Sequence, residues 1–406
     1  MRGAAGGSER GVRLARLALL AAPWLVLTAA GVSLLRNPAA RTSGRSLPTR
    51  GSPAVFDAVE PGRGRLAARP TAIPGRGWRD ILWRTLREAG DDRLSAVAGG
   101  VTFYALLAVF PGLGVFVSLY GLFSDVTQAQ EQLVRLAAFA PGPVVQLIGE
   151  QMVRIAGQKH AELSVAFVVG LLFSAWSASA AMRALCDGLN VAYDETERRS
   201  FVRRMALTYG MTLGLLVFAA LVSGVLVAVP NWLRSLGLAW AEALWTPALW
   251  LILAVLAASA FTAVYRYGPS REEARWRWVW PGGVTAALAW LVGSLGYSWY
   301  LTHVVRLDVT YGSLGAVMGF MLWIWFSALV VLIGAELNAE IEHQTALDST
   351  TGAPQPMGGR GASMADTVGL AFHPERTVKA EWGRIRSLFP RRGQPNSSSR
   401  AARRAA

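Results

Sequence analysis

A long apolar segment near the C-terminus, residues 311–342, constrains the fold more than any other part of the sequence. No charged residue occurs between Ser313 and Ala335. An α-helix rises about 1.5 Å per residue, so roughly twenty such residues cross the ~30 Å hydrocarbon core of a bilayer. Glu336 and Glu340 follow directly, and a charge inside the hydrocarbon costs about 2.5–3.5 kcal/mol, which predicts that both carboxylates lie at the membrane boundary. The sequence therefore predicts an integral membrane protein.

Composition indicates several membrane spans rather than one. Of the 406 residues, 53% are hydrophobic and 16% are charged, which is too apolar for an ordinary soluble protein. The net charge of +14 is compatible with nucleic-acid binding, but basic cytoplasmic loops explain it better in a membrane protein, so we expect no nucleic-acid partner. The single cysteine, Cys186, excludes an internal disulfide and any multi-cysteine metal site.

Further apolar stretches precede this segment, and together they predict an all-α polytopic membrane protein with a six-helix transmembrane bundle. The expected spans are residues 94–123, 163–185, 205–229, 243–264, 280–301 and 311–342. Residues 126–160 carry too many polar side chains to span, and Pro141, Gly142 and Pro143 divide them into two amphipathic pieces. These pieces predict a helical hairpin on the outer face of the membrane.

The flanks differ from the predicted membrane domain, residues 76–343. Residues 1–75 form an N-terminal extension whose apolar segment, 14–35, fits a spanning anchor, a cleaved signal segment, or a start site assigned too far upstream. The rest of this extension is rich in Arg, Gly, Pro and Ser, which predicts a disordered linker. Residues 344–406 predict a basic, mostly disordered cytoplasmic tail. Residues 78–89 predict an amphipathic helix that lies in the headgroup plane.

The distribution of basic residues predicts the orientation of the spans. Residues 76–93 hold five arginines, residues 183–204 hold five and residues 266–277 hold four, whereas the intervening loops hold only three, one and one basic residues. Basic residues are retained on the cytoplasmic side, so both ends of the core are predicted to be cytoplasmic. The lipid bilayer is the expected partner, with anionic headgroups contacting the arginine-rich segments.

Proline and small residues predict bending and close packing within two spans. Pro111 followed by Gly112 predicts a kink in the first span, which either lines a site or merely serves packing. Gly312, Gly315 and Gly319 occupy the first half of the last span, where small residues let another helix approach closely.

Polar side chains gather at the predicted cytoplasmic ends of the spans and form the candidate functional cluster. Its members are Asp91, Asp92, Arg183, Asp187, Asn190, Glu336, Asn338 and Glu340. Glu336 and Glu340 share one helix face, and Arg183 shares another with Asp187. Solvated boundary carboxylates and an Arg183–Asp187 pair are the ordinary explanation. The alternative hypothesis pairs Glu336 with Arg183 across helices, closing the inner mouth of a cavity.

Several ordered motifs make the sequence similar to a known family. They are GGVTFYALLAVFP at 99–111, WSASAAMRALCDGLNVAYDE at 176–195, YRYGPSRE at 265–272, TYGSLGAVMGF at 310–320 and GAELNAE at 334–340. These segments resemble the YihY/virulence factor BrkB family of bacterial inner-membrane proteins over roughly residues 78–343. The resemblance implies six transmembrane helices, cytoplasmic termini and an inner-membrane location. Members have carried a ribonuclease BN label, and a transport role is a suggestion for the family.

Motifs for catalysis are not evident, and two functions stay open. The four histidines are scattered and do not predict a metal-dependent nuclease: His160, His303, His343 and His373. No phosphate-binding loop or nucleophile elbow occurs, so we expect neither an enzyme nor a bound cofactor or metal. The chain is predicted to transport or export a small or lipid-like molecule, or alternatively to serve as a non-transporting scaffold or envelope-maintenance factor. Homo-oligomerisation is left open.

Overall fold

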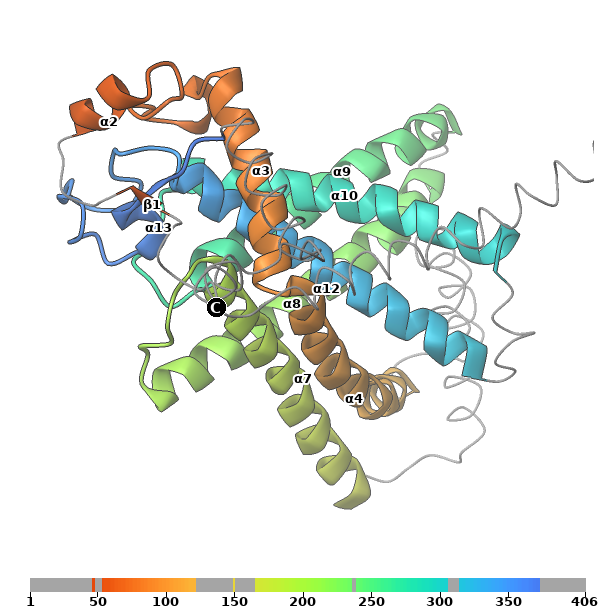
Figure 1. Cartoon of the computed structure of the whole chain (residues 1–406). Coiled ribbons are helices and arrows are strands. Elements are labelled where there is room, and N and C mark those ends of the chain that lie inside the picture. The colour runs from red at the N-terminus through yellow and green to blue at the C-terminus, as the bar shows by residue number, and fades with distance from the viewer. Residues whose placement is uncertain are drawn as a thin grey trace, which may run out of the picture. The chain divides into compact units, whose positions relative to one another are not determined.

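The computed structural model of the chain describes residues 46–47, 53–121, 149, 165–235, 239–305 and 314–372 (Figure 1). Its long helices are α3 (Gly75–Asp91), α4 (Leu94–Gly121), α7 (Val165–Ala192), α8 (Phe201–Ser235), α9 (Ala239–Tyr267), α10 (Trp276–His303) and α12 (Gly315–Glu342). The shorter elements are α2 (Pro53–Val59), η1 (Pro70–Ala72), α13 (Ser363–Asp366), β1 (Ser46–Leu47) and β2 (Val368–Gly369). The two short strands pair antiparallel, and the regular structure of the described residues is otherwise helical, which agrees with the predicted all-α fold.

Several of these helices are long and apolar enough to cross a membrane, which confirms a polytopic membrane protein. Four qualify within the described residues, namely α8, α9, α10 and α12. The pair α3 and α4, bent by 60° at its break, makes a fifth if it is counted as one span. The predicted spans correspond in order to α4, α7, α8, α9, α10 and α12, but the count of six stays a prediction.

Exposed apolar side chains on these helices fit contact with lipid. Leu213 and Leu216 on α8, Leu251 and Val255 on α9, and Val292 on α10 are all largely exposed. Apolar surface repeated along long helices would be unfavourable in water and is the normal surface of a transmembrane helix.

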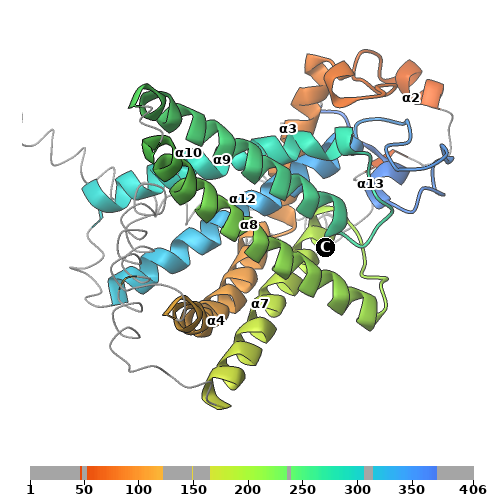
Figure 2. The ribbon, with the colours of Figure 1, turned by 180° about the vertical axis from the view of Figure 1, so that it is seen from behind.

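Helix α12 is the central helix of the fold, because α3, α4, α7 and α10 all pack against it (Figures 1 and 2). Helix α10 packs in turn against α9, and the two run side by side in both views. Small residues allow the close approach: a Cβ added to Gly334 would lie 2.8 Å from the Cβ of Ala286, and one added to Gly188 would lie 2.9 Å from Leu332. Every residue of α12 from Gly334 to Glu342 is buried.

The predicted packing glycines are only partly described. Gly315 and Gly319 are buried on α12, and the Gly319 carbonyl accepts a 2.7 Å hydrogen bond from the Tyr297 hydroxyl. Helix α4 continues through Pro111 and Gly112, and the predicted kink there stays a prediction. Three further predictions lie outside the described residues: Gly312, the apolar segment 14–35, and the outer hairpin over 126–160 apart from residue 149.

Two segments predicted to be disordered are instead folded where the structure describes them, at residues 53–74 and 344–369. Arg65 is fully buried and donates to the backbone carbonyls of Gln344 (3.1 Å) and Gly369 (2.7 Å). Its guanidinium also pairs with Glu60 at 2.5 Å. Ion pairs and hydrogen bonds to backbone carbonyls therefore hold the two segments together, beside a small buried apolar cluster of Phe56, Ala346 and Val368.

Candidate functional site

The last two turns of α12 carry polar side chains that are almost completely buried. Glu336 is 0% exposed, Glu340 is 1% exposed, and Asn338 and Glu342 are also inaccessible. The central position of α12 explains this burial, since neighbouring elements cover each of its faces. Burying an ionised carboxylate is costly unless a cation or hydrogen-bond donors compensate it, so each of these groups needs a partner.

Glu340 has such a partner in Arg84 of α3. The Arg84 Nε forms an ion pair with the Glu340 carboxylate, and its Nη2 donates to the Gln344 side-chain oxygen at 2.8 Å. Arg84 is only 3% exposed, so this is a buried pair. The ring of His343, at the C-cap of α12, lies 3.5 Å from the same carboxylate. The negative charge of Glu340 is thus compensated within the fold.

Glu342 and Asn338 are also satisfied, and their contacts are structural. Arg271 forms a 2.6 Å ion pair with Glu342, joining the α9–α10 loop to the end of α12. Pro281 interrupts the hydrogen-bond ladder of α10 near its start, and Asn338 satisfies backbone groups beside it. The Gly282 N–H donates to the Asn338 side-chain oxygen at 2.8 Å, and the Asn338 amide donates to the Val279 carbonyl at 2.8 Å. Asn338 therefore holds α10 against α12.

Glu336 is different, because neither of its carboxylate oxygens has a hydrogen-bond partner among the described residues. It lies one helical turn before Glu340 and lines a small cavity of about 10 Å³, which we call the acidic pocket. The acidic pocket is lined by Arg84, Glu88, Asp92, Asp194, Glu336, Glu340, His343 and Met364. Five of these side chains are carboxylates, against one arginine and one histidine.

The backbone at the rim of the acidic pocket is unusual. In the part of the chain that the structure describes, two residues other than glycine have a positive φ: Arg93 at 53° and Asp194 at 52°. Arg93 follows Asp92 at the 60° bend between α3 and α4, and Asp194 follows the end of α7. Non-glycine residues seldom adopt this left-handed region, and such strain concentrates at functional sites. Both turns bring an aspartate to the acidic pocket.

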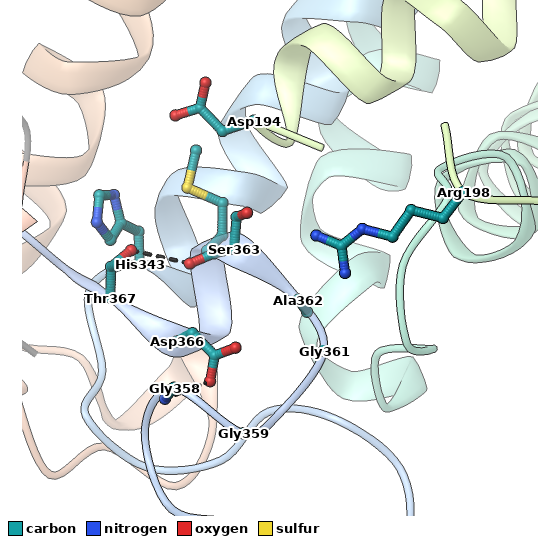
Figure 3. Close-up of a pocket in the computed structure, with 11 residues that line it drawn as sticks. Asp194, Arg198, His343, Gly358, Gly359, Gly361, Ala362, Ser363, Asp366 and Thr367 are labelled. Carbon is teal, nitrogen blue, oxygen red and sulfur yellow. Dashed lines mark hydrogen bonds between the residues drawn. The ribbon is translucent and has the colours of Figure 1, made fainter. Parts of the chain in front are cut away.

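A larger, partly open cavity adjoins the acidic pocket. Its volume is about 660 Å³, and the two share Asp194, His343 and Met364 as lining residues. Figure 3 shows the Arg198 side chain extending toward the glycine-containing segment 358–361, with His343 on the opposite side. Backbone N–H groups of Gly358 and Arg360 donate to the Asp366 carboxylate, so local hydrogen bonds hold the conformation of this segment.

The structure does not support the predicted pairing of Glu336 with Arg183. The Arg183 guanidinium donates to Ser179 Oγ at 2.8 Å on its own helix, and no described contact joins it to Glu336. The cation that pairs with Glu340 is Arg84, on the helix that we expected to lie among lipid headgroups. One sequence feature could have indicated that this helix packs against the bundle. Asp80, Arg84 and Glu88 recur every four residues and form a polar stripe on one helix face, and all three are buried.

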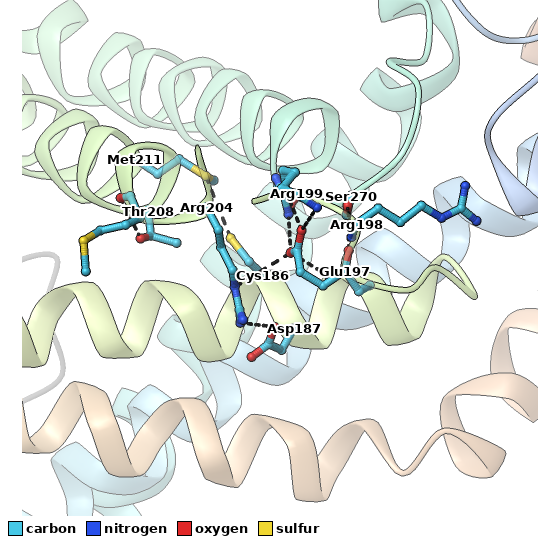
Figure 4. A network of polar contacts seen from close by, with 12 residues as sticks. Cys186, Asp187, Glu197, Arg198, Arg199, Arg204, Thr208, Met211 and Ser270 are labelled. Atoms are coloured by element: carbon cyan, nitrogen blue, oxygen red, sulfur yellow. Dashed lines mark hydrogen bonds and ion pairs between the residues drawn. The ribbon is translucent and has the colours of Figure 1, made fainter. Parts of the chain in front are cut away.

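The remaining predicted site residues do not enter the acidic pocket, apart from Asp92. Asp187 pairs with Arg204 at 2.6 Å rather than with Arg183, as Figure 4 shows. Asn190 accepts a 2.7 Å hydrogen bond from the Ser270 N–H, which joins the end of α7 to the α9–α10 loop. Asp91 is half exposed and lies 3.5 Å from Arg87. These groups connect elements, whereas Asp92, Glu336 and Glu340 line one cavity.

A second polar network, centred on Glu197, holds the loop between α7 and α8 (Figure 4). The hydrogen-bonded Arg199 side chain, 2.8 Å away, lowers the pKa of Glu197 to about 2. The Arg199 guanidinium also donates to the Gly268 carbonyl at 2.8 Å. This network holds the loop between α7 and α8, which begins near Asp194, and so supports the rim of the acidic pocket.

Comparisons with known proteins agree with the membrane fold. A family model described as Virulence factor BrkB matches residues 85–357. The chain is 26% identical to the ribonuclease-like protein YfkH of Bacillus subtilis over 59% of this chain and 86% of that protein. It is 30% identical to a UPF0761 membrane protein of Chromohalobacter salexigens over 67% of this chain and 66% of that protein. No solved structure matches the chain.

A further relative extends beyond the region it shares with this chain. The chain is 24% identical to the UPF0761 membrane protein Nmul_A0452 of Nitrosospira multiformis over 68% of this chain but only 64% of that protein. About a third of that relative therefore has no counterpart in the match.

Proposed function

This chain belongs to the Virulence factor BrkB family, and we propose that it acts as a multi-pass transporter or exporter of a small or lipid-like molecule. The observation that supports the proposal most is the unpartnered, fully buried Glu336 beside a cavity of about 660 Å³. Ionisable groups buried among transmembrane helices are costly, and in transporters they mark the pathways of ions and substrates.

The arrangement of the acidic pocket favours transport over a purely structural role. A helix bundle that only needs to be stable gains nothing from a buried carboxylate without a donor, since an apolar residue of similar size would pack there at lower free energy. Unfavourable local features, such as a strained backbone or a buried polar group without a partner, occur mainly where function requires them. Among the described residues, the unpaired Glu336 coincides with strained turns at Arg93 and Asp194.

The larger cavity suggests the kind of substrate. Its volume of about 660 Å³ lies within the range of small-molecule pockets, roughly 300–1,000 Å³. Its lining is mostly polar, with Arg198, Ser363, Asp366 and Thr367 beside three glycines. These features favour a small polar molecule over a lipid chain.

A flux assay tests this proposal. Full-length protein in liposomes is tested against a panel of radiolabelled small polar solutes and fluorescent lipids, with heat-inactivated protein as the matched control. We expect native protein to move at least one small polar solute faster than the control. Arg198→Ala, which removes a cation from the cavity wall together with its 3.8 Å ion pair to Glu195, should reduce that flux. Identical fluxes for native and inactivated protein across the whole panel would contradict the proposal.

A scaffold role is the alternative, and one observation favours it. Residues 60–84 and 340–369 are joined by buried contacts, such as Arg65 to Gly369 and Arg84 to Glu340, which form a rigid polar layer suited to holding partners. Under this alternative, loss of the protein would change envelope integrity without any measurable flux in liposomes.

Orientation, location and lack of catalysis are part of the same proposal. We propose an inner-membrane location with both core termini cytoplasmic, contact between arginine-rich segments and anionic lipid, and no enzymatic activity. The support for the orientation is the alternation of basic loops along the sequence. Reporter tags placed after residues 123 and 267 should report opposite compartments, and matching compartments for both tags would contradict the orientation.

A further inference from the structure

We propose that the acidic pocket is a proton-binding site in which Glu336 carries an exchangeable proton. The use of this proton to drive substrate movement rests on the proposed transport function, whereas the binding of the proton does not. The reaction is the simple equilibrium in which a carboxylate takes one proton from water to become a carboxylic acid, and returns it to water.

The groups that line the acidic pocket with Glu336 are mostly carboxylates. Helix α3 contributes Arg84 and Glu88 and ends at Asp92, the turn after α7 contributes Asp194, and α12 contributes Glu340 with His343 at its C-cap. Arg84 is committed to Glu340 by a buried ion pair. Glu336 thus faces other carboxylates with no donor to either of its own oxygens. Like charges enclosed together disfavour a further ionised group, so the pocket favours an added positive charge.

A proton fits this pocket better than a metal ion does. Within the described residues, no group of three or more His, Cys, Asp or Glu side chains is arranged to hold a metal. The cavity volume of about 10 Å³ is close to the minimum for one water molecule, which leaves no room for a hydrated cation. A proton needs no ligand shell and no volume, and it removes the negative charge of Glu336 directly.

The pocket also has a route to water. Asp194, His343 and Met364 line both the acidic pocket and the larger cavity, so the two cavities meet at these side chains. Figure 3 shows Asp194 and His343 at the wall of the larger cavity. Neither ring nitrogen of His343 has a hydrogen-bond partner among the described residues, and the ring lies 3.5 Å from Glu340. A histidine at this place is suited to pass protons between the cavity and the carboxylates, because its imidazole ring has two nitrogens that can each bind or release a proton.

Infrared difference spectroscopy on the full chain in lipid nanodiscs tests the inference. The C=O band of a protonated carboxyl is recorded near neutral pH in potassium buffer, for the wild type, Glu336→Gln and the exposed-acid control Asp91→Asn. We expect the band in the wild type and in the control, and its loss in Glu336→Gln. Glutamine has the shape of the protonated acid, so this variant should fold, which tryptophan fluorescence verifies.

Two outcomes would overturn the proton site. One is an unchanged carboxyl band in folded Glu336→Gln protein, and the other is loss of the wild-type band when sodium replaces potassium at constant pH, since a metal cation would then occupy the pocket. The flux assay is independent of this result. A band that depends on Glu336 without any flux would refute only the transport proposal, and flux with an unchanged band would refute only the proton site.

Discussion

Glu336 and Glu340, one turn apart on α12, should differ in how strongly their replacement by glutamine changes the stability of the protein. Glu340→Gln removes the anion that forms a buried ion pair with the Arg84 guanidinium. Breaking a buried pair in this way costs about 3–5 kcal/mol. Glu336→Gln removes no ion pair, because Glu336 has none, and replaces a protonated acid by a neutral group of the same shape. We expect it to change stability by less than about 1 kcal/mol, or to increase it.

Thermal unfolding followed by tryptophan fluorescence measures this contrast, since the chain contains 16 tryptophans. A destabilisation of about 3–5 kcal/mol lowers the Tm by on the order of 10 °C in a chain of this size. Glu340→Gln should show this decrease, and Glu336→Gln should lie within about 3 °C of the wild type. The double variant Arg84→Gln with Glu340→Gln should recover part of the loss, because no buried charge is left alone. An equal decrease for both single variants would refute the reasoning.

Three further perturbations have defined outcomes. Asn338→Leu leaves the Gly282 N–H and the Val279 carbonyl unpaired and should destabilise the protein by about 2–4 kcal/mol in thermal unfolding; an unchanged Tm would contradict the α10–α12 contact. Arg65→Ala should raise hydrogen exchange in residues 344–369 by about a hundredfold or more, as expected for losing two hydrogen bonds from a charged group at about 1.5 kcal/mol each. Unaltered exchange would argue against Arg65 as their anchor. Glu197, with a folded pKa of about 2, stabilises the fold above its unfolded pKa of about 4.3 and loses this effect as pH falls through the folded value. The Tm difference between wild type and Glu197→Gln should therefore be constant near neutral pH and shrink in acid, and a pH-independent difference would oppose this assignment.

The sequence predicts α12 well, because a membrane span needs only local information. Its length, its lack of charge and the common face of Glu336 and Glu340 follow from the 3.6-residue period. The partner of each carboxylate does not follow. Arg84 lies 256 residues away in the chain, and the choice between Glu336 and Glu340 depends on where α3 crosses α12. If α3 crossed α12 one turn nearer its N-terminus, Arg84 would pair with Glu336 and Glu340 would lack this partner.

The contacts of the flanking segments do not follow from the sequence, because composition does not encode specific long-range contacts. Residues 53–74 are rich in proline, glycine and arginine, and residues 344–369 are polar and rich in glycine, which is typical of disorder. Their order comes from particular pairings, such as Arg63 with Asp80 at 2.6 Å and Arg360 with the carbonyl of Ala346 at 2.9 Å. A chain of the same composition in another order would lack these contacts.

The contrast between Glu336 and Glu340 is the central claim, and their charge states can be measured in one sample. Solid-state NMR of the full chain in lipid, with ¹³C-labelled glutamate and assignment by Glu336→Gln and Glu340→Gln, reports the charge of each carboxyl carbon. We expect the shift of a neutral acid at residue 336 and that of an ionised carboxylate at residue 340, near neutral pH. The same charge state at both positions would contradict the account.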